Sequence, residues 1–219
     1  DRWQQFEDMY GIKVLQMYGS SEGGWVCGNR HYRKKKGTVG YPAKHQQFEI
    51  VDGEGAPCPP GVEGEVTVGG PQACVATISP DGEYEDTASA RIKTGDLAVM
   101  DEDGFVRVTG RSKELIIRGG VNIAPLEIDH VLMKHPGVAE AAAVGVPDPI
   151  YGEEIVCYVV AKPGEDLTPG DIESHCARHL APFKLPKAIF FIDSVPKSDC
   201  GKVRRADLRD LWAKENAAA

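Results

Sequence analysis

A change in sequence pattern between Gly37 and Gly110 limits the possible folds more than any other feature. In this stretch, short runs of alternating apolar and polar residues are separated by turn-forming pairs such as Asp52-Gly53 and Gly69-Gly70. Alternation with a period of two is typical of strands with one buried face, and these glycine pairs are typical of tight turns. The pattern therefore predicts a small antiparallel sheet or barrel, with strands near residues 48–51, 64–68, 97–100 and 105–109.

Helical patterns lie on either side of this stretch. Residues 3–10 carry apolar side chains at helical spacing before Gly11, and residues 13–18 predict a strand that runs into the glycine- and serine-rich loop 19–24. After Gly110, the sequence predicts a compact α+β unit. Its helices are expected at 125–135, 169–180 (with Thr168 as the N-cap) and 206–213, and its strands at 138–146, 155–161 and 188–192.

Composition and charge exclude several classes of protein. The 219 residues carry a formal net charge of −8, which makes nucleic acid a poor candidate partner. No apolar run approaches the roughly eighteen residues that a membrane-spanning helix needs. The six cysteines include no C-x-x-C pair, so their spacing favours neither a zinc site nor a disulfide framework, and a reducing cytoplasm is expected.

Two segments in the first half could bind a nucleotide. Tyr18-Gly19-Ser20-Ser21-Glu22 places an aromatic ring, two hydroxyls and a carboxylate on a tight loop, which could stack a base, bond a phosphate and hold a magnesium ion. Thr94-Gly95-Asp96 places an acid beside a glycine turn, where it could accept bonds from both hydroxyls of a ribose. Taken alone, each segment is better explained as an ordinary turn.

Two further segments lie in the second half. Residues 110–122 combine the basic residues Arg111 and Lys113 with a strand and the pair Gly119-Gly120, which would allow a ligand to approach the backbone closely. Residues 196–202 form a polar loop that ends in Gly201-Lys202, and a lysine on such a loop can act as a point charge against a phosphate. A linker with an edge strand, and a solvated surface lysine, are the corresponding alternatives.

The helix after Thr168 carries a possible metal-binding spacing. Asp171, His175 and His179 lie at i, i+4 and i+8. Ile172, Cys176 and Leu180 occupy the other stripe, which is expected to be buried. A solvated polar face therefore explains the first stripe better than a metal site does.

In this order, the four segments resemble the acyl-adenylate-forming (AMP-binding) superfamily, which includes acyl-CoA synthetases, adenylation domains of peptide synthetases and beetle luciferases. The resemblance covers the whole chain and implies the C-terminal portion of such an enzyme, an acid–thiol ligase. It implies an α+β fold in three parts. These are a remnant of a large α/β AMP-binding domain at 1–36, a β-subdomain at 37–110, and a mobile α+β domain at 111–219.

The resemblance also implies a role for each matching residue. Tyr18 would stack on the adenine, Ser21 would touch the α-phosphate, and Glu22 would bind Mg²⁺. Asp96 and Arg111 would bond the ribose. The other matching residues lie in the last part of the chain. Lys113 matches the hinge, and Lys202 matches the catalytic lysine of adenylation. Gly119 and Gly120 match the residues that face the thiol arm of coenzyme A. The implied substrates are ATP, a small carboxylic acid and coenzyme A, with AMP as a product.

The sequence departs from the family pattern in ways that affect these expectations. The phosphate-binding loop of the family and most of its acyl pocket should lie upstream of Tyr18, and the chain opens at Asp1 within an amphipathic pattern. We therefore expect a fragment whose missing N-terminal half is its partner in catalysis, and which is inactive alone. Gly69-Gly70-Pro71 and residues 77–82 also differ from the family pattern, so the resemblance implies a carboxylic acid of no particular class.

Two other functions fit the same residues. One is an adenylation domain that loads a carrier protein, although the Arg118–Asn122 segment resembles that of free-standing CoA ligases. The other is a non-catalytic fragment that only binds CoA or nucleotide. The presence of Glu22, Asp96, Arg111 and Lys202 favours catalysis in the parent enzyme.

Overall fold

The computed structural model describes residues 2–29, 35–88 and 91–216. The chain divides into two compact units, Asp1–Ser112 and Lys113–Ala219. The described residues contain four α-helices and several sheets that are mainly antiparallel, which confirms the predicted α+β class. The division into three parts at residues 36 and 110 stays a prediction.

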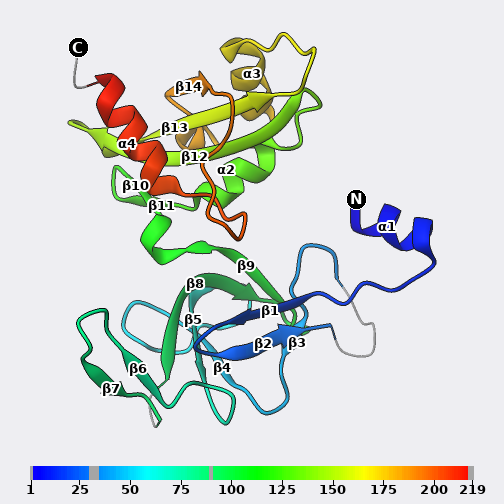
Figure 1. Cartoon of the computed structure of the whole chain (residues 1–219), viewed down its shortest axis with the longest axis vertical. Coiled ribbons are helices and arrows are strands. Elements are labelled where there is room, and N and C mark those ends of the chain that lie inside the picture. The colour runs from blue at the N-terminus through cyan, green and yellow to red at the C-terminus, as the bar shows by residue number, and fades with distance from the viewer. Residues whose placement is uncertain (1, 30–34, 89–90, 217–219) are drawn as a thin grey trace. The chain divides into compact units, whose positions relative to one another are not determined.

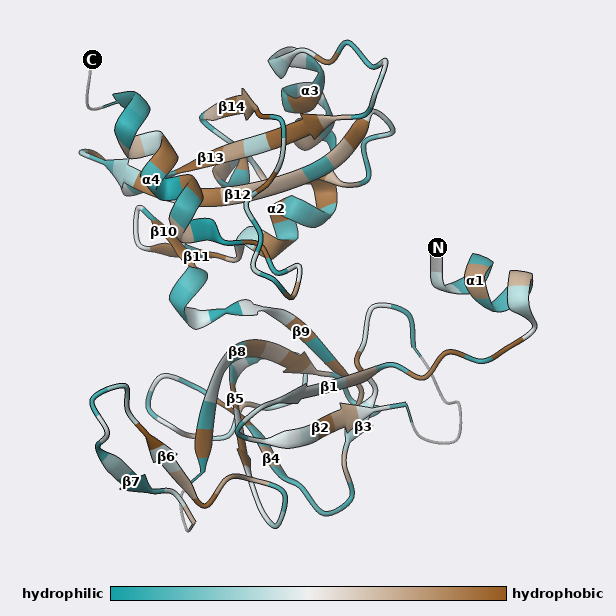
Figure 2. Ribbon diagram, viewed as in Figure 1, coloured by the Kyte–Doolittle hydropathy of each residue, from teal (hydrophilic) through white to brown (hydrophobic). Residues whose placement is uncertain are grey.

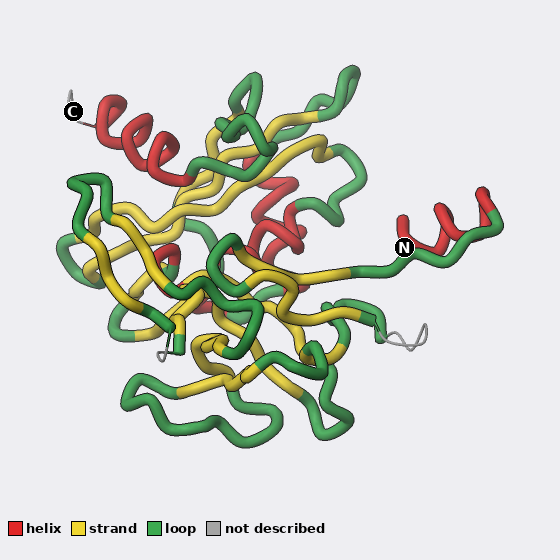
Figure 3. Tube along the Cα trace, turned by 60° about the horizontal axis from the view of Figure 1, so that its bottom comes forward, coloured by secondary structure: helices red, strands yellow, loops and turns green. Residues whose placement is uncertain are grey.

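The first unit is built almost entirely from short antiparallel strands (Figures 1 and 3). Strands β1, β2 and β3 form one sheet, β4, β5, β8 and β9 form a second in that order, and β6 pairs with β7. Its elements are α1 (Arg2–Tyr10), β1 (Met17–Ser20), β2 (Gly24–Gly28), β3 (Tyr41–Pro42), β4 (Gln47–Val51), β5 (Glu63–Gly69), β6 (Ala76–Ile78), β7 (Tyr84–Asp86), β8 (Ile92–Met100) and β9 (Val106–Arg111).

One apolar core holds the first unit together. Buried side chains from β2, β4, β5, β8 and β9 pack in one cluster, and the half-buried Tyr18 of β1 packs against it. The cluster consists of Val26, Cys27, Ile50, Val66, Val68, Ala98 and Val106. Because β1 contributes to the same cluster as the four-stranded sheet, Tyr18 is held close to β8.

The predicted strand at 13–18 is wrong at its N-terminal end. The helix predicted over 3–10 forms as α1 and is followed by Gly11 with φ of 63°, but the strand starts only at Met17. The pairing of β1 with β2 covers Met17–Ser20 alone, and the Val14 amide instead donates to the Glu7 carboxylate at 2.9 Å. The helix therefore satisfies part of the backbone that a longer strand would have paired.

The second unit is a five-stranded sheet with helices on both faces. Strand β13 is central: it pairs antiparallel with β12 along its length and parallel with β14. The elements are η2 (Ser112–Glu114), β10 (Ile116–Arg118), β11 (Val121–Ile123), α2 (Pro125–Leu132), β12 (Val138–Asp148), β13 (Gly152–Ala161), α3 (Pro169–His179), η3 (Pro182–Lys184), β14 (Ala188–Phe191) and α4 (Arg205–Asn216).

Strands β12 and β13 are apolar along most of their length (Figure 2) because both faces are covered. Ala141, Ala143 and the facing residues of β13 pack against α2 and α3. The alternate residues, among them Val144 and Tyr158, pack against Leu208 of α4. Successive side chains of a strand point to opposite faces, so one hairpin serves both layers.

The helices of this unit begin at or next to their predicted first residues, but their ends differ from the predicted ones. Thr168 caps α3, as predicted, and it also forms a capping box with Asp171. Helix α2 begins at Pro125 but ends at Leu132, earlier than the predicted His135. The amides of Lys134 and His135 bond to carbonyls three residues back, so a tighter turn replaces the last helical turn.

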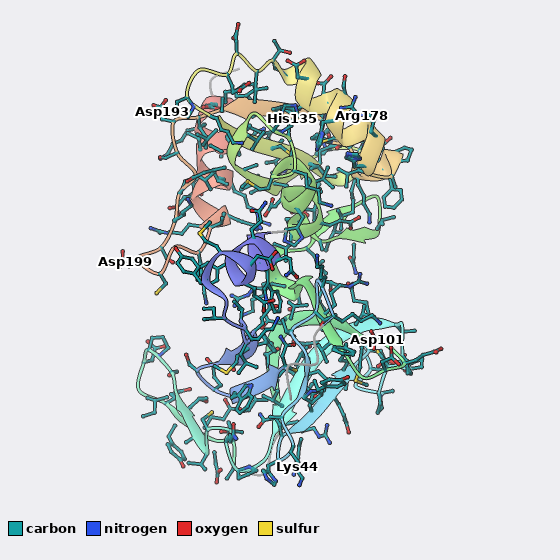
Figure 4. The ribbon with its side chains drawn as sticks, turned by 90° about the vertical axis from the view of Figure 1, so that its right-hand side faces the viewer. Lys44, Asp101, His135, Arg178, Asp193 and Asp199 are labelled. Atoms are coloured by element: carbon teal, nitrogen blue, oxygen red, sulfur yellow. The ribbon has the colours of Figure 1, made fainter. Side chains whose placement is uncertain are left out.

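His175 of α3 is buried, which contradicts the solvated face predicted for it. A ring nitrogen of His175 lies 2.9 Å from the Val131 carbonyl oxygen, and its ring packs edge-on against His135 and His179. Figure 4 shows His135 on the same side of the unit as α3. The described residues contain no group of three or more His, Cys, Asp or Glu side chains arranged to hold a metal ion.

Candidate functional site

Three of the predicted site residues meet around one carboxylate in the first unit. Asp96 on β8 lies opposite Arg111 on β9, and its Oδ1 accepts a bond from the Arg111 Nε at 3.0 Å. Its Oδ2 accepts a bond from the Tyr18 hydroxyl at 2.6 Å. Strand register and the β1 contact thus bring together residues that are 15 and 78 positions apart in the chain.

The backbone around Tyr18 is shaped by the next residue. The register of β1 against β2 shifts between Tyr18 and Gly19. A Cβ atom at Gly19 would lie 2.3 Å from the Gly24 carbonyl oxygen, so only glycine allows this close approach. The irregular pairing therefore depends on the glycine that directly follows Tyr18.

The cluster carries a defined charge pattern. Asp96 is 7% exposed, whereas the Arg111 side chain is 53% exposed. Burial, and then the hydrogen bond to Asp96, raise the pKa of Tyr18 well above its usual value, so the phenol stays a proton donor. Among the described residues, each Asp96 oxygen has one side-chain donor and retains capacity for another, so the carboxylate could accept hydroxyl groups of a ligand.

Ser21 and Glu22 lie on an exposed turn next to this cluster in the chain. The turn backbone is fixed: the Gly23 amide donates to the Ser20 hydroxyl at 2.9 Å, and the Cys74 amide donates to the Glu22 carbonyl at 2.7 Å. The side chains of Ser21 and Glu22 remain exposed. A single exposed carboxylate on a fixed turn suits Mg²⁺ that is bound mainly through substrate phosphates, because Mg²⁺ commonly uses only one or two protein carboxylates.

The other predicted residues belong to the second unit. Lys113 is in η2, and Gly119 and Gly120 form the β10–β11 turn with φ of 57° and 82°. Lys202 is exposed on the loop between β14 and α4, where Figure 4 shows Asp199 at the outer end. The loop is closed by the Ser198 amide, which donates to the Lys202 carbonyl at 2.8 Å, and by an isolated bridge between Lys197 and Val203.

A buried ion-pair network next to Lys202 was missed by the sequence reasoning. Arg205, the first residue of α4, donates from Nε to Glu114 at 2.8 Å, from Nη1 to the Ala143 carbonyl at 2.8 Å, and from Nη2 to Asp129 at 2.5 Å. Asp129 Oδ1 also accepts the Ala143 amide at 2.7 Å. All three donor groups of the guanidinium thus have partners from different elements.

Opposing effects set the charges in this network. Burial raises the pKa of Asp129, although Arg205 acts in the other direction. Burial alone would lower the pKa of Arg205, but the carboxylates of Asp129 and Glu114 raise it overall. A sequence signal for this pair existed: Arg205 lies three residues before the buried Leu208, and Asp129 lies between the buried Ile128 and Val131. A charged residue on the apolar stripe of each of two helices indicates a buried ion pair.

Two family models match the sequence. The model described as AMP-binding enzyme matches residues 1–77, and the model described as AMP-binding enzyme C-terminal domain matches residues 127–202. The first match contains Tyr18, Ser21 and Glu22, and the second ends at Lys202. In the described residues, no helix combines the length and apolar character needed to cross a membrane.

Curated proteins and solved structures agree with these matches. A sulfoacetate–CoA ligase of Cupriavidus necator is 39% identical over 208 residues, or 93% of this chain and 41% of that protein. The fatty acid–[acyl-carrier-protein] ligase ScoC of Streptomyces coeruleorubidus is 42% identical over 181 residues, or 82% of this chain and 35% of that protein. ATP-bound MatB from Rhodopseudomonas palustris gives a TM-score of 0.83 at 30% identity, covering 96% of this chain and 42% of that chain. This chain thus spans about two-fifths of the length of such proteins.

Proposed function

The chain belongs to the acyl-adenylate-forming (AMP-binding) enzyme family, and we propose that it is the C-terminal part of an AMP-forming acyl-CoA ligase. In the first half-reaction, a carboxylate oxygen of a small acid attacks the α-phosphorus of ATP. The bond from the α-phosphorus to the oxygen that bridges the α- and β-phosphates breaks, pyrophosphate leaves, and an acyl-adenylate forms. In the second, the thiolate of coenzyme A attacks the acyl carbon and a thioester forms. The bond from the acyl carbon to the anhydride oxygen breaks, and AMP leaves with that oxygen.

The Asp96 cluster is the observation that carries this proposal. A nearly buried carboxylate with a donor on each oxygen is oriented before any ligand arrives. Such preorganisation favours binding because little freedom remains to be lost. We assign Asp96 and Arg111 to the ribose and the ring of Tyr18 to the adenine.

Charge on the transferring phosphate has to be stabilised as the first half-reaction proceeds. We assign Ser21 to the α-phosphate, Glu22 to Mg²⁺, and Lys202 to the bridge between the substrate carboxylate and the α-phosphate. The magnesium ion would supply Lewis-acid polarisation of the phosphate oxygens. A lysine on an exposed loop can provide a compact positive charge at the same atoms.

The second half-reaction assigns the remaining residues. Lys113 is the first residue of the second unit, which suits a hinge position. We propose that this unit turns about Lys113 and that Gly119 and Gly120 then line the path of the thiol. Neither residue carries a side chain. Apart from Gly120 and its two chain neighbours, no described residue has an atom within 4 Å of the place where a Gly120 Cβ would be.

Loading of a carrier protein is the second candidate function. ScoC, whose name gives an acyl-carrier protein as its acceptor, shares 42% identity with this chain. The sulfoacetate–CoA ligase covers more of the chain, at 93% against 82%, which is why coenzyme A is proposed as the acceptor.

We also propose a cytoplasmic location, because none of the six cysteines forms a disulfide in the described chain.

A lysine substitution tests the proposal in the full-length enzyme that carries this chain. Lys202→Ala should abolish ATP–pyrophosphate exchange with a panel of carboxylic acids, yet spare thioester formation from a preformed acyl-adenylate, because Lys202 acts where charge builds on the α-phosphate. Lys214→Ala, on an exposed residue of α4, is the control and should leave both rates unchanged. Equal loss of both half-reactions in Lys202→Ala would make Lys202 a structural residue.

The 219-residue chain alone provides a second test. We propose that it does not form acyl-adenylate by itself, because the relatives it matches are more than twice as long. Pyrophosphate exchange above background with the purified chain and the same acids would contradict this.

A further inference from the structure

The loop that carries Lys202 is anchored on both sides. On the incoming side, Glu140 of β12 bonds the Val195 amide at 3.2 Å and pairs with Lys197 at 2.5 Å. On the outgoing side, the Arg204 amide donates to the Pro196 carbonyl at 2.9 Å, and Arg205 enters the network with Glu114 and Asp129. The position of Lys202 thus depends on the contacts that hold the two ends of this loop.

The two anchors differ in strength. The side chains of Lys197 and Glu140 are 38% and 36% exposed, and pairs of that kind contribute little because water competes for both charges. Arg205 is 8% exposed and donates charge-assisted bonds to two carboxylates. The stronger anchor is therefore the one at Arg205, three residues after Lys202.

Glu114 connects this anchor to another part of the unit. It directly follows Lys113, and its carboxylate reaches Arg205 across 91 positions of sequence. Asp129 and Ala143 hold the guanidinium from the core, whereas Glu114, whose side chain is 36% exposed, holds it from η2. Removal of the Glu114 carboxylate would therefore loosen one side of the anchor and leave the buried pair in place.

We propose that Glu114 and Arg205 are positioning residues that fix the Lys202 loop to the segment beside Lys113. Lys202 and the segment beside Lys113 then move as one body. The proposal rests on the role proposed above for Lys202, and the geometric part of it is independent of any activity. Neither residue touches the substrates; both act through the placement of Lys202.

Hydrogen exchange of the 219-residue chain tests the geometric part. Glu114→Ala should raise amide exchange across residues 197–204 by roughly tenfold, the size expected for loss of one charge-assisted hydrogen bond. Glu127→Ala is the matched control: it removes a Glu–Lys pair of 2.6 Å in the same unit without touching the Arg205 network. Exchange in β12 and β13 reports whether the unit stays folded.

The outcomes separate clearly. Parent-like exchange at 197–204 in Glu114→Ala would overturn the proposal. Loss of protection throughout β12 and β13 would do the same, since Glu114 would then support the whole unit. Faster exchange confined to 197–204, absent from Glu127→Ala, would support it.

Kinetics in the full-length enzyme test the functional part. Glu114→Ala should lower kcat of adenylation about tenfold with little change in the KM for ATP, and should leave thioester formation from acyl-adenylate at the parent rate. Glu114→Gln, which keeps an oxygen acceptor, should recover part of the loss. Equal damage to both half-reactions would overturn the positioning role, whereas a parent enzyme that forms no adenylate would refute the proposed function and leave the exchange result to decide the anchor.

Discussion

Asp96 is held from two strands, so its orientation depends on partners that lie far from it in sequence. Tyr18 occupies one carboxylate oxygen and Arg111 the other. Tyr18 thereby has two roles in the proposed site. Its ring would stack on the adenine, and its hydroxyl orients the Asp96 carboxylate that would bind the ribose. These contributions can be separated by removing the hydroxyl alone.

Tyr18→Phe keeps the ring and removes the bond to Asp96. We expect about 1 kcal/mol less stability of the first unit, because one acceptor of a nearly buried carboxylate loses its donor. In the full-length enzyme, the KM for ATP should rise several-fold with a smaller change in kcat. Steady-state pyrophosphate exchange and urea unfolding measure the two effects. Tyr84→Phe is the control: Tyr84 is 69% exposed, and its substitution should change neither the KM for ATP nor the stability. An unchanged KM for ATP in Tyr18→Phe would mean that the bond from Tyr18 to Asp96 does not contribute to nucleotide binding.

Asp148 gives a pH-dependent prediction in the second unit. Its bond from Lys187 at 2.8 Å, together with the Tyr151 and Ile150 amides, lowers the pKa of the carboxyl to about 2. A lowered pKa in the folded state adds stability that is fully present above the unfolded pKa of about 3.9 and is lost as the pH falls towards 2.

Asp148→Asn should therefore destabilise the chain at pH 6 and lose part of that deficit at pH 3. Urea unfolding of both proteins at the two pH values gives the comparison. A deficit of the same size at both pH values would mean that ionisation of Asp148 does not contribute.

Helix α3 shows how local chemistry can define an element. The Thr168 hydroxyl accepts the Asp171 amide at 3.3 Å, while the Asp171 carboxylate accepts the Thr168 amide at 2.9 Å. Each side chain satisfies an amide that the helix itself cannot reach. The start of this helix is thus determined by residues within four positions of one another.

Thr168→Ala should lower the free energy of unfolding of the second unit by about 1 kcal/mol, the usual cost of losing an N-cap. Thr168→Ser keeps the hydroxyl and should restore most of the stability. Chemical unfolding followed by circular dichroism measures both. If alanine and serine behave alike, the cap does not contribute.

Elements governed by local signals were predictable, and those governed by distant contacts were not. The capping residue of α3 and the alternation of β4, β5 and β9 lie within short windows of sequence. The start of β1 depends on Glu7, and the burial of His175 depends on Val131 of another helix. At the candidate site, the motifs indicated candidate residues. The bonds from Tyr18 and Arg111 to Asp96 join three strands, which no local pattern encodes.

The molecule as a whole consists of two units that join at Ser112 and Lys113. Each has its own apolar core, so a change of backbone torsion at the junction need not disturb either core. This arrangement suits the proposed use of the second unit in two successive half-reactions.

Lys113→Pro should restrict the torsion that such a turn requires. In the full-length enzyme we expect adenylation to survive and transfer to coenzyme A to fail, measured as separate half-reactions. Transfer at the parent rate would contradict the hinge assignment. If the full-length enzyme without substitutions does not transfer the acyl group to coenzyme A but loads a carrier protein, the second candidate function replaces the first.

Gly120→Leu should also block transfer, by obstructing the thiol path rather than the hinge. Leucine is strained there because φ is 82°, so the effect of strain needs a control. Gly164 has φ of 84° and equally open surroundings in the same unit, and Gly164→Leu should carry the same strain while transferring the acyl group normally. Equal transfer defects in the two variants would assign the effect to strain.

The double-sided hairpin of β12 and β13 has a consequence for biosynthesis. One of its faces is covered by α4, which follows every other element of the second unit in the chain. While a ribosome is still making this region, Val144, Val156 and their neighbours lack that cover and are exposed to other nascent chains. Arg205 begins α4, so the anchor beside Lys202 also forms only when this helix docks. A chaperone that shields β12 and β13 until translation passes α4 would therefore protect both solubility and the placement of the lysine.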